Sequence, residues 1–222
     1  MNYFAHALPW LDQPYFLAGL AVPDWLSVVN RKCRVRPKSV NRATPELSTD
    51  GQQIAAGILQ HLDDDRWFHG TPAFFEAVGV LGAEYRRILP EDAGWKCGFL
   101  GHITLEILID AVLIDDHPHH LEAYYDVMES VDGELVEETV SQLSTVPAEN
   151  LATFVELYRR ERFLVDYLDN TQLLRRMNQV MRRVELELLP PDVSEVFDLG
   201  RDWIRPRLPD LLPVAVNDAR RS

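Results

Sequence analysis

The sequence predicts an all-α fold, a multi-helix bundle, from three observations. Apolar residues recur every three to four positions through most of the 222 residues, which is the period of a helix with one buried face. The apolar–polar alternation of strands is nearly absent, and no Asn-Gly or Asp-Gly pair joins two alternating segments as a hairpin turn. Residues typical of helix starts and stops separate the stretches that have this apolar period. Helices therefore account for most of the expected structure.

The first well-bounded helix is expected from Thr49 to Phe68, where Gly70 supplies the stop. The next begins at Thr71-Pro72, because a capping hydroxyl is followed by proline at the first helical position, and it runs to about Leu89. A third helix, from Glu91 to about Ile114, is apolar nearly all round and belongs in the centre of a bundle. Further helices are expected at 118–130, 133–144, 148–168, 170–188 and 192–205, and the Pro- and Arg-rich tail is expected to fray.

Length and composition predict a single helical domain over residues 1–222, with a core at 1–116 and a helical extension at 117–222. The net charge of −13 disfavours non-specific nucleic-acid binding, which needs an excess of Lys and Arg. Two cysteines cannot build a disulfide framework. The apolar start of the chain lacks the basic end of a signal peptide, and we expect no membrane span. The expected location is the cytoplasm; the oligomeric state is left open.

Six basic residues and no acidic ones lie between positions 31 and 42: Arg31, Lys32, Arg34, Arg36, Lys38 and Arg42. In so acidic a chain this segment is either a solvated loop or a docking patch for an anionic substrate or acidic partner.

Histidines and carboxylates recur at four-residue spacing in two of the expected helices. One series is His61, Asp65 and His69, and the other is His102, Glu106 and Asp110. Residues four apart lie one turn above each other, so each series predicts a polar stripe along one helix face. The second stripe interrupts an apolar helix, and ionisable groups in such a place persist when they pair or bind a metal. Two facing stripes are typical of divalent-metal sites in helical bundles.

The N-terminal segment adds His6 and Asp24, the latter after Pro23, where we expect a break in an apolar stretch. No thiolate joins this set, which favours one or two zinc, manganese or iron ions in a hydrolytic role. Asp63 and Asp64 are expected on other, solvated faces of their helix. A later cluster, expected in a loop and a helix start, comprises Asp115, Asp116, His117, His119 and His120.

The same residues carry a family resemblance over about residues 1–115. The opening Met1-Asn2-Tyr3-Phe4-Ala5-His6, then Leu17-Ala18-Gly19 leading to Asp24, resembles the start of bacterial acyl-carrier-protein phosphodiesterases. So does Gly57-Ile58 before His61, Asp65 and Pro72, and Ile103-Thr104-Leu105 before Asp110. The chain departs from the family at Asp63-Asp64, where the family has a basic pair, and at His69, where its position is acidic.

The resemblance implies an HD-phosphohydrolase-like helical fold and hydrolysis of the phosphodiester between phosphopantetheine and a carrier-protein serine. It implies metal-site roles for His6, Asp24, His61, Asp65 and Asp110. The order of histidines and carboxylates is also similar to zinc-dependent phospholipase C and P1 nuclease.

We therefore expect a metal-dependent phosphoesterase on a bundle that is HD-like or phospholipase-C-like. Its metal ligands are expected among His6, Asp24, His61, Asp65, His69, His102 and Glu106. Asp24 or Asp110 is expected to orient or deprotonate the attacking water. The expected partner is an anionic phosphate ester, with acyl carrier protein one candidate. The alternatives are a non-catalytic helical interaction module with a degenerate metal site and, less favoured by the four-residue spacing, a di-iron oxidase.

Overall fold

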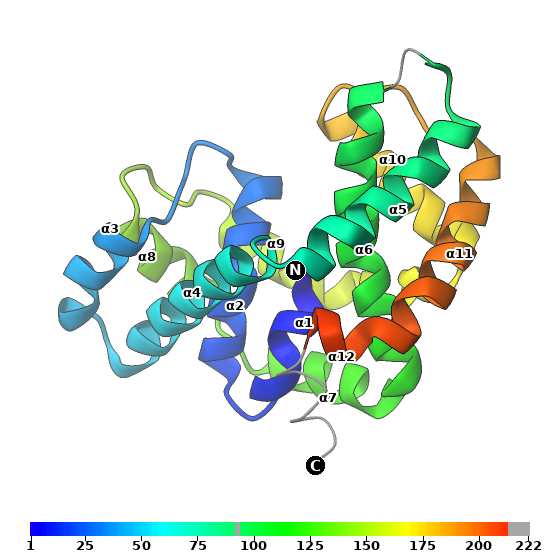
Figure 1. Ribbon diagram of the computed structural model, residues 1–222. Coiled ribbons are helices and arrows are strands. Elements are labelled where there is room, and N and C mark those ends of the chain that lie inside the picture. The colour runs from blue at the N-terminus through cyan, green and yellow to red at the C-terminus, as the bar shows by residue number, and fades with distance from the viewer. Residues whose placement is uncertain (92–93, 213–222) are drawn as a thin grey trace. The chain divides into compact units, whose positions relative to one another are not determined.

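The computed structural model describes residues 1–91 and 94–212, and over these residues the fold is all-α, as predicted (Figure 1). The described residues form twelve α-helices and several short 3₁₀ segments but no strand. A single antiparallel bridge joins Val35 to Ser144. The polar tail from residue 213, expected to fray, lies outside the described residues.

The packing divides the chain into two units, and each contains residues from both sides of position 117. Unit 2 comprises Tyr3–Trp67 and Pro118–Arg162; unit 1 comprises Met1–Asn2, Phe68–His117 and Phe163 onward. The single-domain interpretation stays a prediction. Residues 118–162 pack with the N-terminal helices, and later helices pack with the central one.

Unit 2 surrounds its two earliest helices with helices from the second half of the chain. Its helices are α1 (Tyr3–Ala7), α2 (Pro14–Val29), α3 (Pro37–Ala43), α4 (Thr49–Phe68, whose last residue belongs to unit 1), α7 (Pro118–Glu129), α8 (Gly133–Leu143) and α9 (Leu151–Glu161). Helix α2 packs against α1, α7 and α9, and α8 packs against α9. Phe4, Trp25, Tyr124 and Tyr158 are fully buried and make edge or tilted ring contacts. Aromatic side chains therefore fill this core.

Unit 1 is built around α6 (Gly94–Asp116), which packs against α5 (Pro72–Ile88), α11 (Ser194–Ile204) and the 3₁₀ segment Phe163–Leu168. The unit also contains α10 (Asn170–Arg183) and α12 (Leu208–Leu211). Thr71 caps α5 as predicted, because its hydroxyl accepts a hydrogen bond from the Phe74 N–H at 3.2 Å. Gly101 allows α5 and α6 to pack closely, since a Cβ there would lie 2.8 Å from the Val78 carbonyl oxygen.

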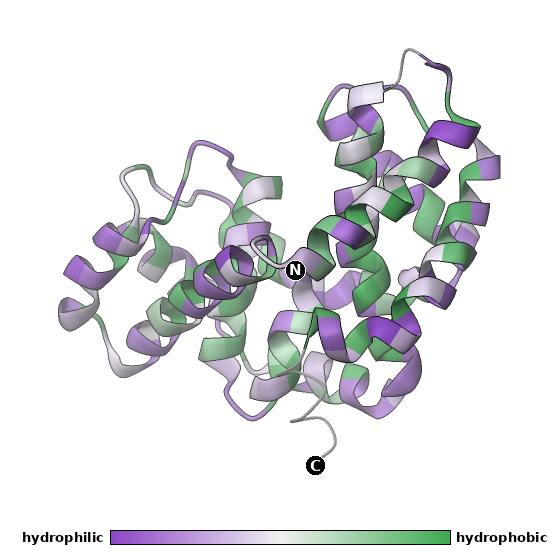
Figure 2. Cartoon of the chain, in the orientation of Figure 1, coloured by the Kyte–Doolittle hydropathy of each residue, from purple (hydrophilic) through white to green (hydrophobic). Residues whose placement is uncertain are grey.

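Helix α6 is the central helix that its apolar sequence predicts, and most of its length is hydrophobic in Figure 2. By length and composition it could also cross a membrane, although 72% of its most apolar stretch is buried inside the structure. A soluble core helix passes the same test, so the finding is weak evidence for a span.

Several helix boundaries differ from the sequence expectation. The helix expected over 170–188 ends at Arg183. The helix expected over 148–168 is divided, because Arg162 adopts a left-handed backbone (φ 42°) that ends α9 before the 3₁₀ segment begins. Pro23 was expected to mark a break, but α2 continues through it, so Asp24 lies on a regular helix. Packing against α1, α7 and α9 stabilises α2 and can offset the backbone hydrogen bond that Pro23 cannot donate.

The basic segment is partly ordered into α3, which begins at Pro37. All six basic residues are exposed, whereas Cys33 between them is buried and its thiol donates to the Ser144 hydroxyl at 3.3 Å. The segment is therefore anchored at its apolar residues with its cationic groups outward.

Candidate metal centres

Among the residues that the structure describes, two groups of three side chains could each hold a metal ion, one group within each unit. The first is His6, His61 and Asp65, and the second is His69, His102 and Glu106. Within each group one ligand atom per residue lies within 4.8 Å of the others. Six of the seven predicted ligands thus belong to two candidate centres, which we describe separately, and Asp24 belongs to neither group.

The first centre is assembled from α1 and α4. His6 lies on α1, and both His6 and His61 are about 2% exposed. Their imidazole rings stack with centroids 4.1 Å apart. His6 Nε2 is 3.4 Å from one carboxylate oxygen of Asp65, and His61 Nε2 is 3.5 Å from the other. Both imidazoles therefore present the same nitrogen to the same carboxylate.

Hydrogen bonds at the opposite ring nitrogens orient these imidazoles. His61 Nδ1 lies 2.7 Å from the Leu20 carbonyl oxygen, which can only accept, so Nδ1 must carry the proton. His6 Nδ1 lies 3.2 Å from Asp64 Oδ2, which likewise accepts. In the neutral rings Nε2 then keeps its lone pair. This arrangement is the usual way in which a protein prepares histidine to ligate a metal.

Close backbone packing between α2 and α4 makes the His61 contact with Leu20 possible. A Cβ on Gly57 would lie 2.1 Å from the Phe16 carbonyl oxygen, and one on Gly19 would lie 2.2 Å from the Ile54 carbonyl oxygen. Only glycine fits at this crossing. The sequence thereby brings a helix carbonyl to the ring that it orients.

The ligand spacing of the first centre fits a small divalent ion. Two ligands bound at about 2.0–2.1 Å to one tetrahedral ion are about 3.3 Å apart. Each imidazole Nε2 lies at a similar separation, 3.4 or 3.5 Å, from its own oxygen of Asp65, and one ligand atom from each residue lies within 4.8 Å of the others. His6 Nε2 is buried, and its contact with Asp65 at 3.4 Å does not meet the geometry of a hydrogen bond. A buried polar atom left in this way is costly unless something binds it. These residues therefore fit a metal ion, with three protein ligands and room in the coordination shell.

Charge complementarity supports the same assignment. Burial alone would raise the pKa of Asp65, but the two imidazoles beside it hold that pKa well below its usual range. Burial opposes the charge on His61, yet Asp65 and Asp24 raise its pKa overall. Asp65 is therefore a carboxylate at neutral pH, as a metal ligand must be.

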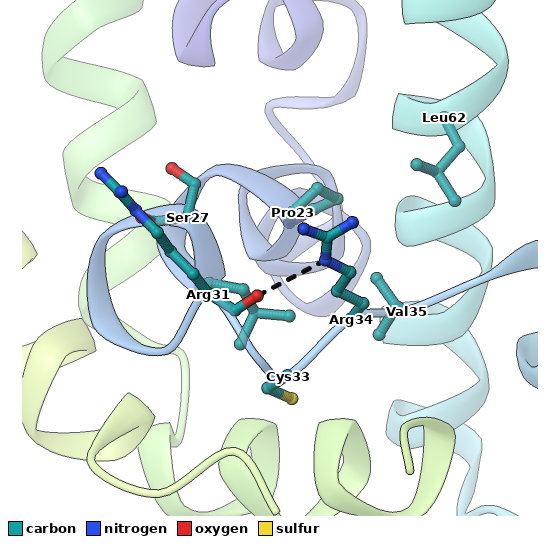
Figure 3. A pocket seen from close by; sticks show the side chains of 8 residues that line it. Pro23, Ser27, Arg31, Cys33, Arg34, Val35 and Leu62 are labelled. Atoms are coloured by element: carbon teal, nitrogen blue, oxygen red, sulfur yellow. Dashed lines mark hydrogen bonds between the residues drawn. The ribbon is translucent and has the colours of Figure 1, made fainter. Parts of the chain in front are cut away.

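Asp24 lies on α2, half-buried, near enough to His61 to affect its charge. Its neighbour Pro23 lines a pocket of about 370 Å³, as does Leu62, the residue after His61 (Figure 3). Arg31 and Arg34 lie on the same pocket, and Arg34 Nε donates to the Arg31 carbonyl oxygen at 3.4 Å. A pocket with cationic and apolar walls thus adjoins the helix turns that carry Asp24 and His61. The pocket is completed by Leu26, Ser27, Cys33 and Val35.

The second centre lies where His69, just beyond the end of α4, meets one turn of α6. His69 Nε2 is 2.8 Å and His102 Nε2 is 3.0 Å from the same oxygen, Oε1 of Glu106. The Met1 amino group is 3.0 Å from that oxygen as well. Burial would raise the pKa of Glu106, but His102 and His69 lower it far below its usual range. Glu106 is therefore ionised at neutral pH.

Neither of the two polar stripes predicted from the four-residue spacing stays together as one group of ligands. His69 was expected to continue the face of His61 and Asp65, but α4 ends at Phe68 and the turn carries His69 to the α6 group. Asp110 is fully buried on α6 and belongs to neither group of three. Its role as a catalytic carboxylate stays a prediction.

Asp64 is the residue that sequence reasoning missed. It was expected on a solvated face, but its carboxylate accepts from Gln60 Nε2 at 2.7 Å and orients His6. The four-residue spacing of Gln60 and Asp64 was an available signal. Asp63 is exposed as expected and pairs with Arg66. In the later cluster, Asp115 and Asp116 pair with Arg205, and none of its five residues joins a candidate centre in the described chain.

Known proteins provide no relative with which this geometry can be compared. No family model matches the chain, and no significant match was found among curated proteins or among solved structures.

Proposed function

We propose that the protein is a metal-dependent phosphoesterase whose metal ion is held by His6, His61 and Asp65. The observation that carries the proposal is the orientation of both imidazoles, with each Nδ1 hydrogen bonded to an acceptor and each Nε2 facing Asp65. Two histidines and one carboxylate form a donor set typical of catalytic rather than structural sites, because positions stay open for substrate. Manganese and zinc are the ions we expect.

A divalent ion held there supplies a Lewis acid that polarises a phosphoryl oxygen. Groups of the protein itself perform the proton transfer and orient the ligands. Asp24 accepts the proton of the attacking water, since it is a half-buried carboxylate near His61 on the adjoining helix. Leu20 and Asp64 keep the two imidazoles protonated at Nδ1 and hold their rings in place.

The adjoining pocket supports a phosphate ester as the substrate class. Arg31 and Arg34 supply cationic groups for an anionic ester, and Pro23, Leu26 and Leu62 supply an apolar wall for its organic part. An ester of an uncharged, extended alcohol fits both kinds of wall. The phosphopantetheine linkage of acyl carrier protein, which the sequence resemblance implies, is the first such ester to test.

Hydrolysis assays on the full chain, with added Mn²⁺ or Zn²⁺, test the proposal on a panel of phosphodiesters and phosphomonoesters. Asp24→Asn keeps the shape of the side chain but removes its charge, so turnover should fall by roughly 10²–10⁴-fold while the fold persists. Asp63→Asn, on an exposed carboxylate of α4, is the matched control and should leave turnover unchanged.

A second pair of variants tests whether the pocket binds the substrate. Arg34→Gln should lower kcat/KM by roughly 10- to 100-fold through loss of a charge-assisted contact with phosphate. Arg36→Gln, on an exposed arginine that does not line the pocket, should have a much smaller effect. If no phosphate ester is hydrolysed with any divalent ion, the proposal is wrong and a non-catalytic interaction module with a metal site takes its place.

A further inference from the structure

We propose that His69, His102 and Glu106 form a second, separate site for a zinc-class divalent ion, which fastens the His69–Gly70 turn to α6. This site is independent of the proposed phosphoesterase centre, because it shares no residue with it. A bound ion should stabilise unit 1, because it would join the His69–Gly70 turn to α6.

The geometry places three ligands of the right kind around one point. His102 and Glu106 lie one turn apart on α6, so the helix itself fixes their separation. His69 approaches from another segment, 37 residues away in sequence from Glu106, and both Nε2 atoms lie within 3.0 Å of Glu106 Oε1. Side-chain shifts of about half an ångström would reach the roughly 3.3 Å ligand spacing of a tetrahedral ion.

Apolar packing holds the two imidazoles in this orientation. The Phe74 ring contacts both His69 and His102, at centroid distances of 4.9 and 5.1 Å. The two imidazoles also meet edge-on, with centroids 4.8 Å apart. Imidazole rings that are already held by packing lose little conformational entropy when they bind an ion, which favours a high affinity for the metal.

The charge of the position also favours a cation. Glu106 is mostly buried, with 18% of its side chain exposed, and its carboxylate already pairs with one cation, the Met1 amino group, whose contact a metal ion would replace. Two imidazole nitrogens with a carboxylate suit zinc, cobalt or nickel better than magnesium or calcium, which prefer oxygen ligands. Half-exposed His69 and His102 side chains leave the ion a path from solvent.

The decisive experiment counts zinc on the full chain after chelator treatment, zinc addition and gel filtration. Wild type should retain two equivalents, His61→Ala one and His102→Ala one. The double variant should retain none. His119→Ala, which removes an exposed histidine outside both centres, is the matched control and should retain two.

Spectroscopy and stability identify the ligands. Cobalt bound to His61→Ala should give visible d–d bands that Glu106→Gln shifts and His102→Ala abolishes. In the same His61→Ala protein, zinc at about 100 times its Kd should raise Tm by roughly 5 °C or more. His102 is half-exposed, so its removal should leave the fold intact by circular dichroism.

Outcomes separate this inference from the proposed function. If zinc on His61→Ala persists after His102→Ala, or if His61→Ala binds none, the second site does not exist and the cluster is an ion-pair network. If wild type hydrolyses no ester but His61→Ala loses its remaining zinc on His102→Ala, the phosphoesterase proposal fails and the second site stands.

Discussion

Gly57→Ala tests the idea that a backbone crossing orients the first metal centre. The new Cβ would lie 2.1 Å from the Phe16 carbonyl oxygen and 2.9 Å from the Leu20 backbone nitrogen. Both are backbone atoms of α2, so no side-chain rotation can relieve the clash. The helices must separate by about 1 Å or more to restore ordinary contact.

The loss in free energy of unfolding expected for Gly57→Ala follows from the same contacts. Overpacking costs about 1–3 kcal/mol. A separation of that size also stretches the 2.7 Å contact between His61 Nδ1 and the Leu20 carbonyl oxygen, and a buried polar pair left unsatisfied costs about 1–3 kcal/mol more. The better helix propensity of alanine offsets about 1 kcal/mol of this loss. We therefore expect the free energy of unfolding to fall by about 1–5 kcal/mol.

Urea unfolding measures this loss, and zinc titration of the folded protein should show weaker binding, because His61 is no longer held. Gly79→Ala is the matched control. Gly79 is an exposed glycine within α5 around which a Cβ meets nothing within 4 Å, so alanine there should stabilise by about 0.5–1 kcal/mol. If Gly57→Ala is as stable as wild type and binds zinc equally well, the crossing does not orient His61 and the reasoning is wrong.

Three further predictions concern residues outside the metal centres. Arg159→Met should lower the free energy of unfolding by about 2–4 kcal/mol in urea, because the guanidinium Nη1 donates to the Met128, Glu129 and Val131 carbonyls and methionine cannot; unchanged stability would contradict this. Asp132→Ala should cost about 1 kcal/mol, since Asp132 caps α8 by accepting from the Glu134 and Leu135 N–H groups, and Asp126→Ala, an exposed position on α7, is the comparison. Burial raises the pKa of Tyr85, so its stabilising contribution is complete below the unfolded-state pKa near 10 and is lost as pH rises above it. In Tyr85→Phe the fall of unfolding free energy between about pH 10 and 11 should therefore be shallower, by at most about 1.4 kcal/mol per pH unit, and an unchanged slope would refute that assignment.

The sequence by itself determined the helical class and several boundaries of this protein. Period and capping chemistry are local properties, so the stop at Gly70 and the Thr71-Pro72 start were readable without a structure. The all-round apolar character of α6 likewise predicted its central position in the core. The residue types that could ligate a metal were also visible from their spacing.

Only the tertiary structure decided which of those residues meet. Spacing along one helix could not show that His69 leaves the stripe of His61, because a single turn after Phe68 redirects the chain. Nor could it place His6 against Asp64 and Asp65, since that contact joins segments 58 residues apart. Ligand sets depend on contacts between distant segments, and these are fixed by how helices pack rather than by any local pattern.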